Sequence, residues 1–337
     1  MRILLDVMGG DLPPCELVRG GIAAGHQSGV DILFAGDPEV VRAALNAHNE
    51  VEGGCFTILP TTQTIGMDES PVQAVRSKRD SSLVRGLIAL KARDVDAFVS
   101  PGNTGAVVAG SIFTLGRIAG IPRPGIAASI PTVLGEEILV IDVGANVDCA
   151  PAHLVHFALM GASYARDVLR ISHPRIGLLN IGTEKAKGNK LNYRAFELLE
   201  AGPLPFAGNV EGHHLLTERP VDVVVCDGFV GNVFLKALEG GVLAVSGLLK
   251  GSIRDSFRAK IGGLLLRPIF SVLRDRLSYQ RFGGAPLLGV NGVVVIAHGR
   301  SDAKAIESAI EVARCAVEAD LNAEIGRGIS GWSTDGG

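Results

Sequence analysis

Short runs of β-forming apolar residues alternate with segments of helical period along this chain of 337 residues. Such alternation is typical of a parallel sheet with helices packed on both of its faces. Two of the runs, EILVIDVGAN and VDVVVCDG, are almost continuously hydrophobic, as expected of strands that are buried on both faces. The sequence therefore predicts an α/β fold, a three-layer α/β/α sandwich around a mostly parallel, doubly wound sheet.

Eight strands are expected, at Arg2–Val7, Asp31–Ala35, Cys55–Leu59, Ala97–Ser100, Ile138–Val143, Arg175–Ile181, Val221–Cys226 and Val293–His298. No change in composition marks a linker, so residues 1–325 are expected to form a single domain. Within this domain, residues 242–282 are predicted to be an amphipathic helical insertion that protrudes from the sandwich. Residues 326–337 have little to bury and are predicted to be a disordered tail.

Charge and cysteine content narrow the class of protein. The net charge of −3 gives no support for nucleic-acid binding, which normally needs a basic surface. The five cysteines are widely separated and form no CxxC pair, which favours a reducing cytoplasm over a disulfide or zinc framework. Asp6 interrupts the first apolar run too early for a signal peptide, and no later stretch has about 18 uninterrupted apolar residues. We therefore expect an intracellular protein.

One arrangement recurs at the ends of the apolar runs, where glycine follows together with aspartate, asparagine or a charged residue. It occurs in LLDVMGGD, AFVSPGNTGA, VIDVGAN, LLNIGTEKAKGN, AGNVEG, VVCDGFVGN and VVIAHGRSD. In open α/β sheets, ligands bind outside the carboxyl ends of the strands, where helix N-termini present free N–H groups. Ordinary helix capping and turn formation explain any one of these seven segments. Taken together, they favour a shared ligand cleft.

The segment LLNIGTEKAKGN, residues 178–189, points to a small anion as the ligand. Five residues separate Gly182 from Gly188 and Asn189 follows, so the segment is not a phosphate-binding loop of the Walker type. No GxGxxG follows the first strand, so a dinucleotide is also disfavoured. Glycine N–H groups together with Lys185 and Lys187 suit a phosphate, although both lysines would equally suit an exposed turn.

The sequence gives little support for a covalent intermediate. It contains neither a GxSxG elbow nor an HExxH motif. Cys226 stands beside Asp227, but its place in VVVCDG is more typical of a small buried hydrophobic residue than of a nucleophile. His298, close to Ser301, suits a proton donor or a phosphate ligand, and equally a capping or core residue. No structural metal is predicted, because the His213–His214 pair lacks metal-ligand spacing with nearby carboxylates.

The motifs DVMGGD, SPGNTGA, DVGAN, NIGTEKAKGN, GNVEG, DGFVGN and HGRSD resemble, in this order, those of the PlsX family of bacterial phosphate acyltransferases. The resemblance extends from Arg2 to about residue 325. It implies acyl transfer from acyl-acyl carrier protein to inorganic phosphate, which forms an acyl phosphate for phospholipid biosynthesis without any cofactor. It also implies a fold similar to phosphotransacetylases and isocitrate-dehydrogenase-like enzymes, a homodimer, and peripheral contact with the membrane, where a glycerol-3-phosphate acyltransferase of the same pathway is a candidate partner.

A phosphate that attacks a thioester directly needs its charge held and its oxygen aimed. From their strand-end position and side-chain chemistry, the expected catalytic residues are Lys185, Lys187, Asn103, Asn232 and His298. The expected substrate-binding residues are Asp6, Gly9, Gly10, Asp11, Gly102, Thr104, Asp142, Asn146, Gly182, Thr183, Glu184, Gly188, Asn189, Asn209, Glu211, Asp227, Gly228 and Ser301. The asparagines are candidate donors to phosphate or to the thioester oxyanion, a contact whose loss commonly costs about 3 kcal/mol of transition-state stabilisation.

The predicted insertion concentrates positive charge, with eight basic and two acidic residues between Val242 and Phe282. Apolar residues recur at spacings of three and four between the basic ones, which places them on one helical face. Gly262–Gly263 and Pro268 are expected to divide the segment into two helices. It suits a membrane surface, an acidic carrier protein or a dimer or core contact. The residues expected to contact membrane or carrier protein are Lys250, Arg254, Arg258, Lys260, Leu264, Leu265 and Arg267.

Two other functions remain open at this stage. A phosphotransacetylase that uses CoA thioesters would need similar strand-end residues. A non-catalytic membrane scaffold would need the basic segment and not the strand-end residues. A nicotinamide-dependent dehydrogenase is disfavoured by the absence of a dinucleotide fingerprint.

Overall fold

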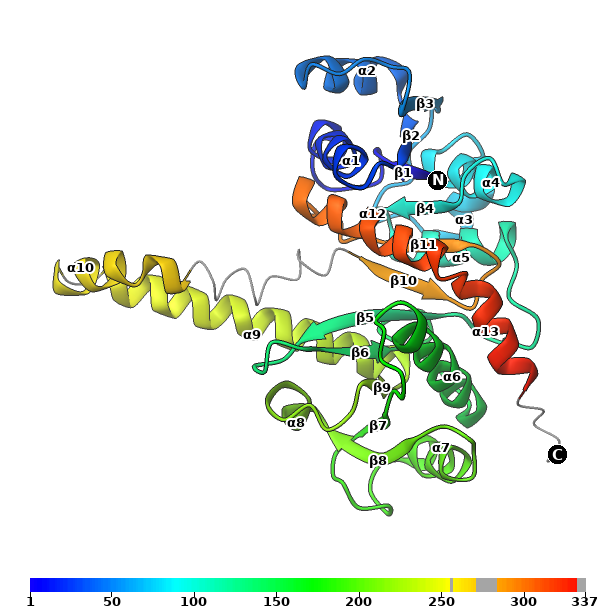
Figure 1. Ribbon diagram of the computed structural model, residues 1–337, viewed down its shortest axis with the longest axis vertical. Helices are drawn as coiled ribbons and strands as arrows, with labels where there is room; N and C mark the ends of the chain where they lie inside the picture. Colours follow the sequence, from blue (N-terminus) through cyan, green and yellow to red (C-terminus); the bar gives the residue numbers. More distant parts are fainter. Residues whose placement is uncertain (255–256, 271–283, 332–337) are drawn as a thin grey trace.

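The computed structural model describes residues 1–254, 257–270 and 284–331, except for the side chains of residues 254, 257 and 258. Its strands form an 11-stranded sheet in the order β3-β2-β1-β4-β11-β10-β5-β6-β9-β7-β8 (Figure 1). They are β1 (Arg2–Asp6), β2 (Asp31–Gly36), β3 (Phe56–Pro60), β4 (Ala97–Ser100), β5 (Gly125–Pro131), β6 (Glu137–Ile141), β7 (Ile176–Asn180), β8 (Phe206–Glu211), β9 (Val223–Val225), β10 (Ala285–Leu288) and β11 (Val293–Ile296). All eight predicted strands are confirmed.

Helices cover both faces of the sheet, which confirms the predicted three-layer sandwich. They are α1 (Pro14–Ser28), α2 (Pro38–Ala47), α3 (Pro71–Ser77), α4 (Ser82–Ala92), α5 (Thr104–Thr114), α6 (Pro151–Asp167), α7 (Lys190–Glu200), α8 (Gly212–Thr217), α9 (Gly228–Arg254), α10 (Phe257–Leu265), α12 (Ala303–Glu318) and α13 (Leu321–Ser330). One apolar core includes residues of α3, α4, α5, α8 and α9. On the other face, one core includes residues of α1, α2 and α12, and another includes residues of α6, α7 and α13.

Three strands were missing from the prediction because their sequences carry weak β signals. GIAASIP in β5 and APLL in β10 contain small residues and proline, and FAGNVE in β8 is interrupted by glycine and asparagine. Two of these strands, β10 and β5, determine the relative direction of the two halves of the sheet. β10 is antiparallel to both β11 and β5, and β5 is antiparallel to β6.

The consequence is that the two halves of the sheet run in opposite directions. β1, β2, β3, β4 and β11 are mutually parallel, and so are β6, β7, β8 and β9. Three antiparallel pairings, β11 with β10, β10 with β5 and β5 with β6, lie between the two groups. The strands of the second group therefore run opposite to those of the first. The strand-end loops therefore belong to two sets at opposite edges of the sheet, so a ligand cleft shared by all seven segments would include loops from both edges.

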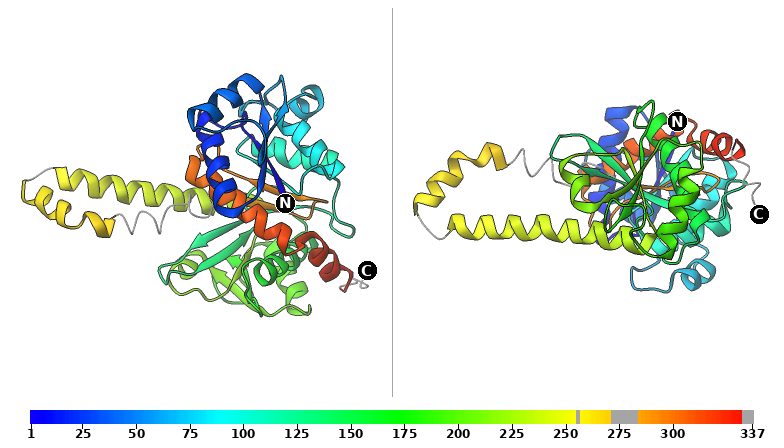
Figure 2. Two further views of the ribbon diagram at one scale, coloured as in Figure 1. Left: turned by 45° about the horizontal axis from the view of Figure 1, so that its top comes forward. Right: turned by 90° about the horizontal axis from the view of Figure 1, so that it is seen from below.

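Helix α9 is the element that connects these two sets of loops. Its N-terminus packs against the loop after β6, where a Cβ atom on Gly231 would lie 2.0 Å from the carbonyl oxygen of Asp142. Phe234, Leu235 and Leu238 then pack on the core along the next turns. Beyond the sheet, α9 projects away from the sandwich, and α10 folds back beside it (Figures 1 and 2).

The predicted insertion is helical, as expected, but its boundaries differ. α9 begins at Gly228, well before residue 242, and the break between α9 and α10 follows Arg254. Gly262–Gly263 lies inside α10, because Gly263 faces Ile253 of α9 at the helix contact and does not end the helix. α10 ends at Leu265, before Pro268, as proline requires. Residues 271–283 of the segment lie outside the described structure.

The predicted tail is also corrected, since helix α13 continues through Gly326 and Gly328 to Ser330. Ile325 and Ile329 are buried in the same apolar core as α6, which gives this glycine-containing segment a surface to bury. Only residues 332–337 of the predicted tail lie outside the described structure.

Within the described residues, one helical stretch, Gly228–Ile253 in α9, is long and apolar enough to cross a membrane. Length and composition alone are weak support for a span. The first turns of this helix pack on the core of the sandwich through Phe234 and Leu238, which leaves only its distal turns free of the sheet.

Candidate functional site

The loop after β6 is organised by the carboxylate of Asp142, which is fully buried. Asp142 Oδ1 accepts hydrogen bonds from the backbone N–H groups of Ile126 (3.0 Å), Gly144 (3.0 Å) and Ala145 (2.9 Å). Oδ2 accepts from the backbone N and the side-chain Nδ2 of Asn146, each at 2.8 Å. Burial raises the pKa of Asp142, whereas these five donors stabilise its ionised form.

The start of α9 closes over this loop. Gly228 donates its N–H to the carbonyl of Asn146 (2.8 Å), and a Cβ atom at Gly228 would lie 2.8 Å from Asp142 Oδ2. Asp227 caps the helix by accepting from the N–H groups of Phe229 and Val230. The roles of Asp142, Asn146 and Asp227 within the chain are therefore structural, and Gly228 allows the close approach of the two segments.

Asn232 differs from the other predicted asparagines. It is exposed in the first turns of α9, and its side chain lies beside Gly144. Among the residues that the structure describes, none forms a hydrogen bond with its amide. Its amide is therefore available to a substrate at this edge of the sheet.

The segment 181–189 lies beside this loop. Ile141, Val225 and Leu178 pair in one row across β6, β9 and β7, so the loops that follow these strands emerge side by side. Asn180 closes the segment by donating to the carbonyl of Lys187 (3.0 Å). Gly188 has a φ of +98°, a left-handed conformation that favours glycine.

The two lysines of this segment are held differently. Lys185 pairs with Glu200 of α7 and lies 5.2 Å from the centroid of the Phe196 ring, and its ion pair with Glu200 raises its pKa. Lys187 is 3.9 Å from Glu184 and is half exposed. Lys187 is therefore less constrained than Lys185, and its ammonium group is easier to direct toward an anion.

Other predicted residues in or near this segment form hydrogen bonds within the protein. Asn189 caps α7 by accepting from Asn192 N (3.0 Å). Asn209, nine-tenths buried, donates to the carbonyl of Glu184 (2.9 Å), while its Oδ1 has no partner among the described atoms. Thr183 and Glu184 are exposed, and Gly182 is buried.

At the opposite edge, Asp6 organises the loops after β1 and β4. Its carboxylate is fully buried and accepts from Ser100 Oγ (2.8 Å) and from Met8 N (3.0 Å). Burial raises the pKa of Asp6. A Cβ atom on Gly9 would lie 2.8 Å from the Cα of Gly102, so only glycine allows these two loops to touch.

Further contacts join the third loop of this edge. Asp11 donates its N–H to the carbonyl of Gly299 (2.7 Å), and Gly10 packs against the same carbonyl. Asn103 caps α5 by accepting from Ala106 N (3.0 Å) and donates to the carbonyl of Met67 (2.9 Å), so its amide groups are engaged within the chain. Thr104 is exposed at the start of α5, and Ser301 is buried.

His298 follows β11 and lies close to α9. Partial burial lowers its pKa, and Lys236 of α9 is the next largest influence in the same direction. His298 Nδ1 accepts from the N–H of Arg300 (3.1 Å), which places the proton of the neutral ring on Nε2. The neutral imidazole is thus oriented as a hydrogen-bond donor.

Helix α9 brings parts of the two edges within reach of each other. Lys236, whose charge acts on His298, is eight positions after Gly228, which lies beside Asp142, and this corresponds to about 12 Å along the helix axis. Helix α9 therefore runs from the Asp142 loop, where Asn232 lies beside Gly144, toward His298 of the other edge. Asn103 and Asn146 use their amide nitrogens within the chain, whereas Asn189 uses only Oδ1, as a helix cap, and Asn209 only Nδ2.

Cys226 is confirmed as a buried hydrophobic residue. Its thiol is 2% exposed and lies 3.4 Å from the carbonyl oxygen of Asp142. Burial raises the pKa of the thiol well above its ordinary value, so it remains protonated and a poor nucleophile at neutral pH.

Solved structures of other proteins share the fold. A phosphotransacetylase from Streptococcus pyogenes matches with a TM-score of 0.62 and 17% identity, over 94% of each chain. A branched-chain phosphotransacylase from Enterococcus faecalis matches with a TM-score of 0.55 and 13% identity, over 94% of this chain and 99% of that one. These similarities confirm the predicted fold class.

Similarity in sequence is much stronger. The model of a family described as fatty acid synthesis protein matches residues 1–324. A phosphate acyltransferase from Desulforudis audaxviator is 46% identical over 329 residues, which cover 98% of this chain and 96% of the relative. One from Dictyoglomus turgidum is 44% identical over 331 residues, 98% of each chain. This chain therefore belongs to the PlsX family of phosphate acyltransferases.

Proposed function

We propose that this protein transfers an acyl group from acyl-acyl carrier protein to inorganic phosphate and so supplies acyl phosphate for phospholipid biosynthesis. The observation that carries the proposal is the match to phosphate acyltransferases along nearly the whole chain. A phosphate oxygen attacks the thioester carbonyl carbon, a C–O bond forms, and the C–S bond breaks. The departing thiolate of the carrier's prosthetic group takes up the proton that the attacking hydrogen phosphate loses on becoming acyl phosphate.

The active site lies along the first turns of α9 in this proposal. Asn232, whose amide is free, and Lys187, whose ammonium group is loosely held, contact phosphate or the developing oxyanion. Lys185 positions the 181–189 segment against α7 through Glu200. His298, with its proton on Nε2, donates a hydrogen bond to the leaving thiolate.

Direct attack by phosphate needs no nucleophilic side chain. Two cysteines near the Asp142 loop, Cys226 and Cys149, support this. Burial raises the pKa of both thiols, that of Cys149 to about 11, so both remain protonated at neutral pH. Holding the two substrates in line can contribute about 7–11 kcal/mol toward the barrier without covalent catalysis.

The donor is tested by offering acyl-acyl carrier protein and acyl-CoA separately to the purified chain with phosphate. Trapping with hydroxylamine measures acyl phosphate, and thiol release measures cleavage of the thioester. We expect phosphate-dependent formation of acyl phosphate from the carrier-protein substrate and far slower formation from acyl-CoA. Exclusive use of acyl-CoA would instead identify a CoA-dependent phosphotransacetylase, and no turnover of either donor would favour a non-catalytic scaffold.

The site residues are tested in the same assay by Lys187→Ala and Asn232→Ala. Each removes a charge or donor that acts on phosphate or the oxyanion, so kcat/KM is expected to fall about 10²–10³-fold. Lys185→Ala should cost less, because the lysine acts through the loop. Lys190→Ala, an exposed lysine at the start of α7, is the matched control. Near-native kcat and phosphate KM in both Lys187→Ala and Asn232→Ala would remove these residues from the site.

We also propose that the protein is a cytoplasmic homodimer whose α9–α10 pair contacts the anionic membrane surface, with carrier-protein docking as a second role of the same segment. Leu264 and Leu265 are 67% and 76% exposed at the end of α10, and Lys250, Lys260 and Arg267 are exposed nearby in the chain. The side chains of Arg254 and Arg258 lie outside the described structure. Delivery to a membrane-bound glycerol-3-phosphate acyltransferase would follow from this location.

Membrane contact is tested by sedimentation with anionic vesicles. A Leu264→Glu/Leu265→Glu variant is expected to lose most of its binding, since it replaces exposed apolar area with charge of the same sign as the lipid. Val51→Glu, equally exposed but in the loop before β3 and outside the α9–α10 pair, is the matched control. If the double variant bound vesicles as the unaltered protein does, with the same oligomeric state, the membrane contact would be elsewhere.

A further inference from the structure

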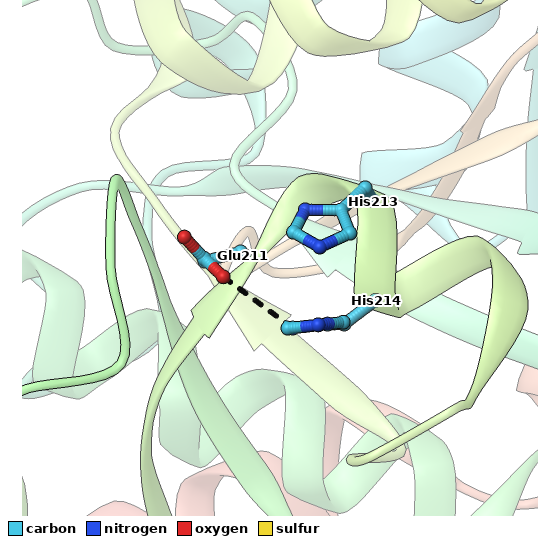
Figure 3. Close-up of side chains that lie close together, drawn as sticks. All are labelled: Glu211, His213 and His214. Atoms are coloured by element: carbon cyan, nitrogen blue, oxygen red, sulfur yellow. Dashed lines mark ion pairs between the residues drawn. The ribbon is translucent and has the colours of Figure 1, made fainter.

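Three side chains at the end of β8 bring together two imidazoles and a carboxylate, and of the three only Glu211 is among the predicted substrate-binding residues. They are Glu211, the last residue of β8, and His213 and His214 in the first turn of α8 (Figure 3). Each offers one ligand atom, and these three atoms lie within 4.8 Å of one another. The spacing along the chain is not a usual zinc pattern, which is why the sequence predicts no structural metal at His213–His214.

The separations of the ligand atoms suit a metal ion. Ligands about 2.0–2.2 Å from a tetrahedral ion lie roughly 3.3–3.6 Å apart. His214 Nδ1 is already 3.5 Å from Glu211 Oε2. The centroids of the two imidazole rings are 3.9 Å apart, and His213 is exposed, so a small rotation of its side chain completes the set without disturbing the core.

A second carboxylate supports the same assignment. His214 Nε2 lies 3.8 Å from Glu218 Oε1, so the ring faces Glu211 with one nitrogen and Glu218 with the other. Histidines that ligate metals through one nitrogen commonly direct the other N–H to a carboxylate, which orients the ring and raises its basicity. Glu218 is placed to do this for His214.

A simple ion pair within the same chain provides a contrast. His26 Nε2 lies 2.7 Å from Glu50 Oε1, closer than the 3.5 Å between His214 Nδ1 and Glu211 Oε2, and among the described residues no third ligand joins that pair. Two groups at hydrogen-bond distance leave no room for an ion between them. The wider spacing and the third ligand distinguish the cluster at Glu211.

We propose that Glu211, His213 and His214 bind one divalent transition-metal ion of the zinc class, with water completing the coordination. Two imidazoles and one carboxylate are a ligand set that Zn²⁺ accepts and that Mg²⁺ and Ca²⁺ disfavour. The ion would brace α8 against the end of β8. Asn209, two residues before Glu211, holds the carbonyl of Glu184, so the bracing reaches the 181–189 segment. The proposal does not depend on the identity of the acyl donor.

Isothermal titration of the chelator-treated full chain with ZnCl₂, and separately with MgCl₂, tests the site. We expect the unaltered protein to bind Zn²⁺. In the His213→Ala/His214→Ala variant, the number of Zn²⁺ ions bound should fall by one, or the affinity should fall more than about tenfold. His26→Ala, the matched control from the simple ion pair, should bind like the unaltered protein. Circular dichroism of each variant establishes that it is folded.

Thermal denaturation provides a second measurement, because an ion that binds only the folded protein raises Tm. Zn²⁺ should raise the Tm of the unaltered protein and of His26→Ala more than that of the double variant. The proposal is overturned if the unaltered protein binds no Zn²⁺, or if the double variant matches it in stoichiometry, affinity and Tm response.

Discussion

The carboxylate of Asp142 is the contact on which the second half of the molecule depends. It lies at the end of β6 and receives hydrogen bonds from β5, through Ile126, and from its own loop, through Gly144, Ala145 and Asn146. The segment around it is bound in turn by α9, whose Gly231 lies against the carbonyl oxygen of Asp142. A buried carboxylate without such donors would be strongly destabilising, so the loop conformation and the charge support each other.

This arrangement explains how two oppositely directed half-sheets can serve one reaction. The carboxyl ends of β1, β4 and β11 lie at one edge, and those of β6, β7 and β9 lie at the other. Asp6 and Asp142 hold the loops at these edges in equivalent ways, each as a fully buried acceptor. α9 starts at the second edge and passes His298 of the first, so the proposed site follows the helix and not a single edge.

Much of the fold was predictable from sequence because long, apolar, β-branched runs identify buried strands reliably. The opposite directions of the two halves of the sheet were not predictable, because β5 and β10 set them. The alanines, glycines and prolines of these strands carry little β signal. The end of the chain was misjudged for a similar reason. Gly326 and Gly328 weaken the helical pattern, and only the packing of Ile325 and Ile329 against the core of α6 reveals α13.

The candidate site was predictable as a set of segments and not as individual roles. Asparagine favours helix caps, turns and substrate contacts alike, and spacing does not separate these uses. The contacts do: Asn103 and Asn189 cap helices and Asn146 holds Asp142, and of the predicted asparagines only Asn232 has neither amide atom hydrogen-bonded within the described residues. Lys185 and Lys187 look alike in sequence, whereas Glu200 and Phe196, which distinguish them, follow more than ten residues later.

The most direct test of the role given to Asp142 is the free energy of unfolding of Asp142→Asn, measured by urea denaturation beside Asp148→Asn, an exposed aspartate of the same loop. The amide NH₂ would face N–H donors that now point at a carboxylate oxygen, so at least one buried donor loses its acceptor. We predict a loss of about 2–4 kcal/mol for Asp142→Asn and less than about 0.5 kcal/mol for the control. Equal stability of the two variants would contradict the account.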